Sequence, residues 1–423
     1  MKFGVFLEMQ LPKPWQAGDE ERLIAEALEQ VVLADALGID HAWAVEHHFL
    51  EEYSHCSASD VFLAAAAVRT TNIRLGFGIR HIIANYNHPA RTAETVGMLD
   101  LISHGRIELG FGEGATRLEL GGFGIPWKEK RAMSLEAAEQ IANMMVMEPY
   151  PGYEGKSFSM PCRNVVPKPA QKPHPPMWMA CTNRDTIRTA AANGLGALCF
   201  NFMDQAEAQT WSRIYYDTIR SEQCIPIGHT VNPNLAIVTA FGLHKNRDEA
   251  VRRNLESFEF FNYALGVVSS KDTRPGRMNM WSDFQAQRES EAGLKKATWA
   301  AGLGGDEKVE RCYTNAPGIG TPEEFRRFAR TMADSGIDQM IFIQQGGRIK
   351  HDHICESLEL FGLDVLPDFR VHEQEREERK MKALAPYIEA ALERKHALAT
   401  LRGGEATAPA TKTQWTNTES AVA

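Results

Sequence analysis

The sequence predicts an α/β fold, a (β/α)8 barrel with insertions and a C-terminal helical extension. Short apolar runs alternate along the chain with longer amphipathic patterns, which is typical of βα units around a parallel sheet. Eight of these runs have the length of a strand, and each is followed by a candidate helix, which favours a closed barrel over an open sheet. The predicted strands span residues 2–7, 41–45, 73–79, 106–112, 177–180, 196–200, 235–243 and 339–343.

The first predicted helix follows from three features of residues 19–38. Asp19 is expected to cap its N-terminus, because a short carboxylate accepts hydrogen bonds from the free N–H groups of the first turn. Apolar residues then recur every three or four positions from Leu23 to Leu37, which gives the helix one apolar face. Gly38 is expected to end the helix, because glycine tolerates a positive φ.

Two stretches interrupt the alternation of strands and helices. Residues 148–176 are rich in Pro and Gly and are expected to form an ordered excursion between the fourth and fifth strands. Residues 265–319 separate the seventh strand from the last helix–strand–helix unit and are long enough to form a lid. Within this stretch, segments 302–305 and 317–320 are candidate hinges because they contain glycine.

The chain is predicted to divide after Phe369 into a catalytic barrel domain, residues 1–369, and an extension, residues 370–423. Residues 373–382 mix both charges densely, and residues 383–402 can form a helix. The Thr- and Ala-rich remainder has too little hydrophobicity to fold alone. We therefore expect a charged helical extension with a flexible tail, outside the catalytic fold.

The composition and charge are those of an ordinary globular protein. Of the 423 residues, 43% are hydrophobic and 24% are charged, and 46 Lys and Arg against 55 Asp and Glu give a formal charge of −9. This mild acidity, without a basic stripe, argues against a nucleic-acid partner. No apolar run approaches the roughly 20 residues that span a bilayer, so no membrane partner is expected.

Two features indicate a cytoplasmic protein. Residues 1–8 enter a strand-like stretch and become polar at once, without the long apolar region of a signal peptide. The seven cysteines are scattered and form no Cys-x-x-Cys pair, so they are expected to be reduced thiols.

Residues 43–49, Trp-Ala-Val-Glu-His-His-Phe, close the second predicted strand, where barrel enzymes gather their reactive side chains. Glu46, His47 and His48 could suggest a metal site, but neighbouring residues on a strand point to opposite faces. The His-Glu-x-x-His spacing of helical zinc sites is also absent, and we expect no metal. One of the histidines is a candidate general acid–base; two structural, hydrogen-bonded histidines are the alternative.

Three alternate glycines, Gly110, Gly112 and Gly114, lie at the end of the fourth predicted strand. They remove side chains where a flat or phosphorylated ligand could touch the backbone. Packing of the strand end is the alternative explanation, because the pattern is not a dinucleotide-binding fingerprint.

Residues 182–186, Thr-Asn-Arg-Asp-Thr, open the helix after the fifth predicted strand. The free N–H groups of a helix N-terminus suit a phosphate, and hydroxyls with an arginine would complete the cradle. Ordinary capping by Thr182 or Asn183 explains the same pattern.

Several motifs, taken in order, resemble those of the bacterial luciferase-like flavin monooxygenases, and the luciferase α chain in particular. The resemblance runs from Met1 to about Phe369, and the order and spacing of the motifs together make it specific. The motifs are Met-Lys-Phe-Gly-x-Phe-Leu at 1–7, Glu-His-His-Phe at 46–49, His-Pro-Ala-Arg at 88–91, Leu-Asp at 99–100, Gly-Arg at 105–106, Gly-Thr-Pro-Glu-Glu at 320–324 and Gly-Ile-Asp at 336–338.

The resemblance implies a TIM barrel that binds reduced FMN supplied by a separate flavin reductase. The implied activity is that of a two-component monooxygenase, which uses O2 to oxidise a small organic substrate through a flavin peroxide. A homodimer is also implied. The alternatives are a deazaflavin-dependent oxidoreductase that transfers hydride on the same fold, and a flavin-binding protein without turnover.

The resemblance also implies roles for individual residues. His47 matches the active-site histidine of the family, which is expected to act as an acid–base. Arg131 matches an arginine that pairs with the flavin phosphate, and Thr182 and Thr186 match hydroxyls on that phosphate. The Gly78–Ile79 peptide falls where family members often carry a non-prolyl cis peptide beside the flavin ring.

Three positions depart from luciferase. Glu113 replaces an arginine expected near the phosphate, and Cys181 replaces a glutamate before the phosphate-binding hydroxyls. Gly112, which is expected to border the flavin, replaces the reactive cysteine of luciferase. Light emission is therefore not expected.

The substrate side of the site is predicted less specifically. Trp43 could supply an apolar wall at the end of the second strand, and Arg80 and His81 could meet a polar group of the substrate. Hydroxylation, Baeyer–Villiger insertion, carbon–sulfur cleavage and dehalogenation use the same flavin chemistry with different pocket walls, so the sequence leaves the substrate open.

Overall fold

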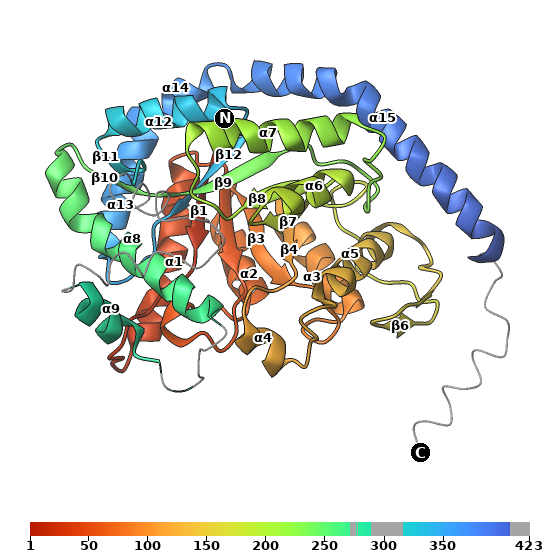
Figure 1. The fold of residues 1–423 in the computed structure, drawn as a ribbon, viewed down its shortest axis with the longest axis horizontal. Coiled ribbons are helices and arrows are strands. Elements are labelled where there is room, and N and C mark those ends of the chain that lie inside the picture. The colour runs from red at the N-terminus through yellow and green to blue at the C-terminus, as the bar shows by residue number, and fades with distance from the viewer. Residues whose placement is uncertain (271–275, 277, 289–315, 407–423) are drawn as a thin grey trace.

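The computed structural model describes residues 1–270, 276, 278–288 and 316–406. Its centre is a closed barrel of eight parallel strands in the order β1-β12-β9-β8-β7-β4-β3-β2 (Figure 1). This confirms the predicted fold class. The strands are β1 (Lys2–Leu7), β2 (His41–Val45), β3 (Arg74–His81), β4 (Ile107–Gly112), β7 (Met177–Cys181), β8 (Gly196–Cys199), β9 (Leu235–Ala240) and β12 (Gln339–Ile343).

The seventh predicted strand, residues 235–243, is shorter in the structure. β9 ends at Ala240 because its last partner in the barrel is Ile343, where β12 also ends. Beyond this point β10 (Gly242–Leu243) pairs instead with β11 (Ile319–Gly320), outside the barrel.

Helices surround the barrel, and short elements fill the connections. The longer helices are α1 (Asp19–Ala36), α2 (Ser59–Arg69), α3 (Pro89–Ile102), α5 (Lys130–Val146), α6 (Arg184–Ala192), α7 (Gln205–Arg220), α8 (Arg247–Ser269), α12 (Pro322–Asp334) and α13 (His351–Leu360). The shorter elements are a 3-10 turn (Glu51–Tyr53), α4 (Arg117–Gly122), α9 (Met280–Arg288), a π turn (Phe361–Val365) and α14 (Leu366–Arg370).

The first helix corrects one prediction. Gly18, with φ at 87°, occupies the N-cap position, and Asp19 is the first residue of α1. The Asp19 carboxylate accepts a hydrogen bond from the backbone N–H of Gln16 at 2.7 Å, so it closes the preceding turn instead of capping the helix. Gly38 ends the helix with a φ of 79°, as predicted.

Two tryptophans fill the middle of the barrel. The rings of Trp43 and Trp178 meet edge to face, with centroids 5.5 Å apart, and both side chains are buried. A Cβ at Gly76 would lie 2.1 Å from the Trp43 ring, and one at Gly196 would lie 2.4 Å from the Trp178 ring. These glycines therefore make room for the indoles. Because the indoles occupy the centre, open space in the barrel is left at the carboxyl ends of the strands.

The excursion predicted at 148–176 is present and contains the antiparallel pair β5 (Tyr153–Glu154) and β6 (Ser159–Met160). Much of the predicted lid, residues 265–319, lies outside the described residues, including the candidate hinge at 302–305. Of the rest, α9 packs against α8 through Phe284, whose ring centroid is 5.5 Å from that of Phe260.

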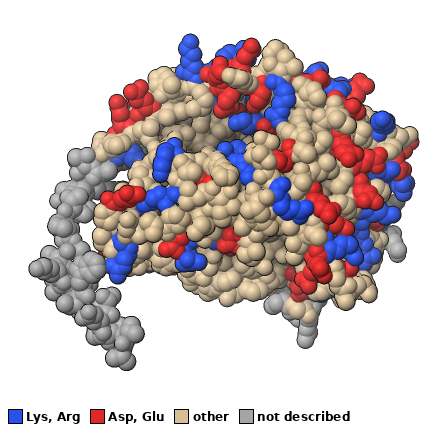
Figure 2. All heavy atoms as spheres, turned by 180° about the vertical axis from the view of Figure 1, so that it is seen from behind, with Lys and Arg blue, Asp and Glu red and all other residues tan. Residues whose placement is uncertain are grey.

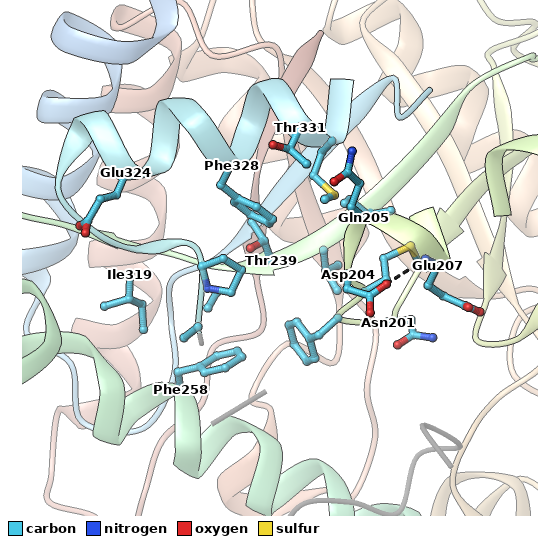
Figure 3. Close-up of a pocket in the computed structure, with 18 of the residues that line it drawn as sticks. Asn201, Asp204, Gln205, Glu207, Thr239, Phe258, Ile319, Glu324, Phe328 and Thr331 are labelled. Carbon is cyan, nitrogen blue, oxygen red and sulfur yellow. Dashed lines mark hydrogen bonds between the residues drawn. The ribbon is translucent and has the colours of Figure 1, made fainter. Parts of the chain in front are cut away.

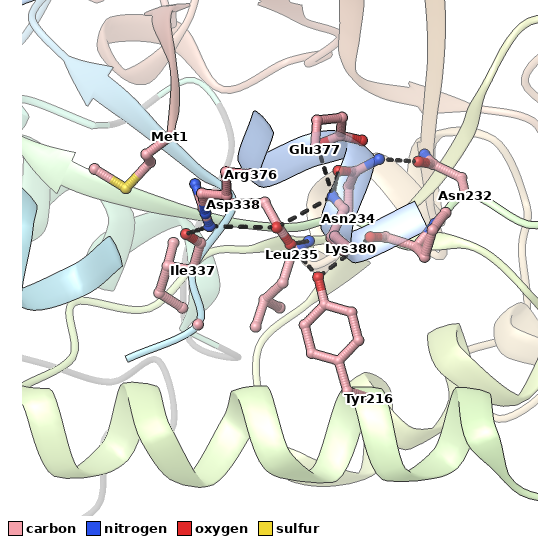
Figure 4. Close-up of polar contacts among 12 residues, drawn as sticks. Met1, Tyr216, Asn232, Asn234, Leu235, Ile337, Asp338, Arg376, Glu377 and Lys380 are labelled. Atoms are coloured by element: carbon pink, nitrogen blue, oxygen red, sulfur yellow. Dashed lines mark hydrogen bonds and ion pairs between the residues drawn. The ribbon is translucent and has the colours of Figure 1, made fainter. Parts of the chain in front are cut away.

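The extension forms a single long helix, α15 (Glu373–Ala406), which runs beside α7 in Figure 1. Asp338, at the start of β12, anchors it: this carboxylate accepts hydrogen bonds from Lys380 at 3.2 Å and from Tyr216 and the Leu235 N–H (Figure 4). The helix thus covers the N-terminal ends of β9 and β12, on the face of the barrel away from the strand carboxyl ends. The predicted tail, residues 407–423, lies outside the described residues.

Other predictions concern the surface and the thiols. Acidic and basic side chains are interspersed on the face seen in Figure 2, without a continuous basic patch there. None of the described helices is long and apolar enough to cross a membrane. The six cysteines within the described residues are all free thiols.

Candidate active site

A cavity of about 410 Å³ opens at the carboxyl ends of the barrel strands. Residues from all eight strands, or from the loops that follow them, line it. Most of the predicted site residues meet here, namely Trp43, His47, Gly78, Ile79, His81, Gly112, Thr182 and Thr186. Arg80 and Arg131 are not among the lining residues.

His47 is held between two carboxylates. Its Nδ1 lies 3.0 Å from Glu119 Oε1, and its Nε2 lies 3.5 Å from Glu8 Oε1. Glu119 is itself fixed at the start of α4, because Thr116 caps that helix and donates its hydroxyl proton to Glu119 Oε2 at 2.7 Å. The imidazole is therefore held in one orientation at the wall of the cavity.

These contacts set the charges of the cluster. Burial alone would lower the pKa of His47, but the carboxylates of Glu119 and Glu8 outweigh burial and raise this pKa to about 9. Burial would raise the pKa of Glu119, yet the neighbouring His47 holds it far below its usual range. Burial dominates at Glu8 and raises its pKa to about 7. At neutral pH His47 thus carries a proton that it can donate into the cavity.

His48 has a different environment from His47, although both follow the end of β2 at Val45. Its Nε2 lies 3.2 Å from Glu46 Oε1, and its ring packs against Phe123 with centroids 5.0 Å apart. It does not line the cavity. The acid–base candidate is therefore His47, and His48 is the structural histidine.

Sequence reasoning missed Glu8 and Glu119. Glu119 lies 72 positions from His47 along the chain, and only the packing of α4 on the barrel mouth joins them. His47, His81 and Glu119 each offer a ligand atom, and these atoms lie within 4.8 Å of one another. A metal there would have to displace the proton of His47, because only the neutral imidazole is a ligand.

The two residues predicted to meet the substrate after β3 separate in the structure. His81 lines the cavity and stacks on Tyr86, with ring centroids 4.3 Å apart. Arg80 is buried behind the wall, where its guanidinium lies 3.5 Å from Glu46 and 3.3 Å from Asp60. These carboxylates hold the guanidinium away from the cavity, so Arg80 does not line it, and its contact with the substrate stays a prediction.

β3 is irregular beside the cavity. Its register with β2 skips a residue after Phe77, so that Val45 pairs with Ile79, and Gly78 bulges. The Gly78–Ile79 peptide is not cis, because every cis peptide bond within the described residues precedes a proline. That expectation was wrong. At Gly112 a Cβ would lie 2.7 Å from Ile79 Cγ2, so the glycine keeps this wall flat.

The predicted phosphate contacts form a cluster that is partly self-satisfied. Arg131 donates to Glu113 at 2.8 Å, and Lys130, which lines the cavity, lies 3.5 Å from the same carboxylate. Thr186 Oγ1 donates to the Asn183 carbonyl at 2.8 Å within a capping box. Glu113, which stands where luciferase has an arginine, thus neutralises positive charge at the place where a phosphate would bind. Lys130 and the Thr182 hydroxyl still line the cavity and can donate hydrogen bonds.

A second cavity of about 460 Å³ lies between α7, α8, α12 and β9 (Figure 3). Phe258 of α8 and Phe328 of α12 face it, with Asn201 and Asp204 at its other side. Val238 lines both cavities, so the two adjoin. The predicted catalytic and flavin-binding residues all belong to the first cavity or its rim.

Comparison with known proteins identifies the family of this chain. A family model described as luciferase-like monooxygenase matches residues 1–339. The alkanal monooxygenase alpha chain of Photorhabdus luminescens is 23% identical over 381 residues, 88% of this chain and 98% of that protein. The oxygenase component of the flavin-dependent trigonelline monooxygenase of Acinetobacter baylyi is 28% identical over 199 residues, 46% of this chain and 52% of that protein. Alignments with other relatives likewise span about half of those proteins.

Solved structures show the same fold. The monooxygenase RslO1 from Streptomyces bottropensis has a TM-score of 0.69 and 25% identity, over 87% of this chain and 100% of that chain. An F420-dependent secondary alcohol dehydrogenase has a TM-score of 0.64 and 16% identity, over 87% and 99% of the chains. The chain therefore belongs to the luciferase-like monooxygenase family of flavin-dependent oxidoreductases.

Proposed function

We propose that this chain is the oxygenase component of a two-component monooxygenase, which takes reduced FMN from a flavin reductase and oxidises a small organic substrate with O2. The observation that carries the proposal is the contact between His47 Nδ1 and Glu119 Oε1, at 3.0 Å, at the wall of a largely apolar cavity. Its relatives include the oxygenase component of a flavin-dependent monooxygenase.

Two features of the cavity support a flavin as its ligand: its wall at Gly112 and its donor groups. Gly112 makes room for the Ile79 side chain, which a Cβ would meet at 2.7 Å, so Ile79 keeps its place in the cavity wall where a flat ring would lie. Lys130 and the Thr182 hydroxyl would hold the phosphate, with Arg131 nearby. Reduced flavin, when bound, supplies the electrons for oxygen activation.

The protein itself contributes exclusion of water and a positioned proton. Ile79, Leu198 and Val238 form apolar walls that keep water from the reacting atoms. His47 holds its proton because Glu119 stabilises the imidazolium, and it would deliver that proton from Nε2 as negative charge develops on oxygen. Glu119 then serves as a positioning residue that sets both the charge and the orientation of His47.

The decisive experiment follows the reoxidation of reduced FMN after mixing with oxygenated buffer in a stopped-flow instrument. With the wild-type protein, oxidised FMN should appear more slowly than from free reduced FMN, because the cavity shields the bound flavin. His47→Gln should alter this time course, whereas His48→Gln should not, because His48 does not line the cavity. Identical reoxidation with and without wild-type protein, or a wild-type time course in His47→Gln, would refute the proposal.

The same preparation tests the deazaflavin alternative. Glu113 occupies the partners that an FMN phosphate would use, which is the observation favouring another cofactor. Titration with FMN and with F420 should give tighter binding of FMN. Tighter binding of F420, with no effect of O2 on turnover, would replace the monooxygenase by a hydride-transferring oxidoreductase.

A further inference from the structure

Glu8 is a buried carboxylate that faces the cavity without a hydrogen-bond donor. It follows directly after β1, is 1% exposed and lines the cavity. Neither of its carboxylate oxygens accepts a hydrogen bond from a described residue. The hydroxyls of Tyr53 and Ser54 lie near the carboxylate and lower its pKa, and the Ser54 hydroxyl donates to the Glu8 backbone carbonyl at 2.7 Å.

The other carboxylates of this region have partners of their own. Glu46 lies 3.5 Å from the Arg80 guanidinium and accepts a hydrogen bond from Asn87 at 2.8 Å. Glu119 accepts hydrogen bonds from His47 and from the His48 backbone N–H, both at 3.0 Å. The cation nearest to Glu8 is the His47 imidazolium, whose Nε2 lies 3.5 Å from Glu8 Oε1. The same imidazolium also pairs with Glu119 through its Nδ1.

This arrangement leaves one negative charge without compensation. An ionised carboxylate that is buried without hydrogen bonds is costly, and a donor supplied by a ligand would remove the cost. Aromatic side chains, Phe6, Tyr53 and Phe200, line the same cavity. Aromatic rings beside a carboxylate favour an organic cation, because the ring faces attract positive charge.

We propose that Glu8 determines substrate class by binding a protonated amine, which donates an N–H group to its carboxylate. That this amine belongs to the substrate rests on the proposed function, whereas the binding of an amine at Glu8 does not. Glu8 then discriminates in two ways: by charge against neutral compounds, and by hydrogen bonding against cations that lack an N–H.

Three probes that share a benzyl group separate these contributions. Benzylamine has both charge and N–H donors, benzyltrimethylammonium has charge only, and benzyl alcohol has a donor without charge. Each is titrated calorimetrically into the protein, with and without bound FMN, at about pH 8, so that Glu8 is mostly ionised. We expect benzylamine to bind most tightly and benzyl alcohol most weakly.

Glu8→Gln keeps the shape of the side chain and removes its charge. It should weaken benzylamine binding by about ten- to a hundredfold, the effect of losing a hydrogen bond to a charged group, and leave benzyl alcohol binding nearly unchanged. Glu46→Gln is the matched control, since Glu46 is buried as deeply as Glu8 but pairs with Arg80 and Asn87 and does not line the cavity. It should keep the wild-type affinity for benzylamine.

The proposal is overturned if wild-type protein binds benzylamine no more tightly than benzyl alcohol, or if Glu8→Gln retains benzylamine affinity. The wild-type comparison decides the matter even if the variant does not fold. Failure of FMN to bind would instead refute the proposed function, because amine selectivity is measured separately on the protein without FMN.

Discussion

The pair formed by His47 and Glu119 makes a quantitative prediction about stability. Replacing Glu119 by Gln keeps the side-chain shape, and the amide can still accept from the backbone N–H of His48. What is lost is a negative charge 3.0 Å from Nδ1 of His47. The pKa of His47 should then fall from about 9 toward its ordinary value of 6.5 or below, since burial disfavours the imidazolium.

The magnitude follows from this pKa shift. The difference between 6.5 and about 9 corresponds to about 3 kcal/mol in favour of the folded state. Coulomb's law at this distance, with an effective dielectric constant of about 20, gives about 5 kcal/mol before the cost of burial is subtracted. We therefore expect Glu119→Gln to lower the free energy of unfolding by about 3 kcal/mol where His47 is protonated in both states.

The pH dependence has a definite sign. A histidine whose pKa is raised on folding stabilises the protein fully below its unfolded pKa, and this contribution disappears as the pH rises through its folded pKa. Glu119, with a lowered pKa, contributes above its unfolded pKa of 4.5. The loss in Glu119→Gln should thus be about 3 kcal/mol at about pH 6 and about 0.4 kcal/mol at about pH 9.

Denaturant unfolding at several pH values measures this difference, and NMR titration of His47 reports its pKa directly. Glu20→Gln is the matched control, because Glu20 also pairs with a histidine, His55, at 2.9 Å but its side chain is 71% exposed. That change should cost less than about 1 kcal/mol at any pH. A loss in Glu119→Gln that does not vary between pH 6 and pH 9 would refute the reasoning.

Three further predictions concern the flavin wall, the phosphate cluster and the extension. Glu113→Gln should tighten FMN binding by up to about fivefold in a fluorescence titration, since it frees basic groups at the rim; unchanged or weaker binding would contradict this. Gly112→Ala should weaken FMN binding because its Cβ would lie 2.7 Å from Ile79, whereas Gly121→Ala, which meets open space, should leave it unchanged. Equal FMN affinities of these two variants would exclude a flavin at this wall. Asp338→Asn should lower stability by about 3 kcal/mol, since it breaks a buried set of ion pairs, without changing FMN affinity. A change in FMN affinity would contradict this prediction, because it would show that the α15 face of the barrel is coupled to the cavity.

The order of strands and helices could be predicted because each element has a hydrophobic pattern within its own segment of the sequence. Each barrel strand is a short apolar run, and each helix has its own apolar period, so residues 2–7 and 41–45 were predicted with the bounds that β1 and β2 have. The seventh strand was predicted too long, because residues 241–243 remain apolar after the barrel partner has ended. The apolar pattern of one strand does not show where the strand that pairs with it ends.

Much of the candidate site could also be predicted, since strand ends in a barrel converge on one face. The positions of His47, Gly112 and Thr182 follow from this convergence, and the structure places all three around one cavity. The convergence of the strand ends did not predict that Arg80 would be buried outside the cavity. Its removal from the cavity depends on Glu46 and Asp60, and no sequence pattern shows those pairings.

The sequence by itself thus determined the order of strands and helices and the end of the barrel that carries the candidate site, and its resemblance to a family pointed to His47. Only the tertiary structure decided the charge of that histidine, because charge depends on which carboxylates approach it and how deeply they are buried. Glu119 comes from a helix after β4 and Glu8 from the end of β1, and both meet His47 only in the closed barrel. Periodicity acts along the chain, whereas electrostatic energy depends on distance and burial in space.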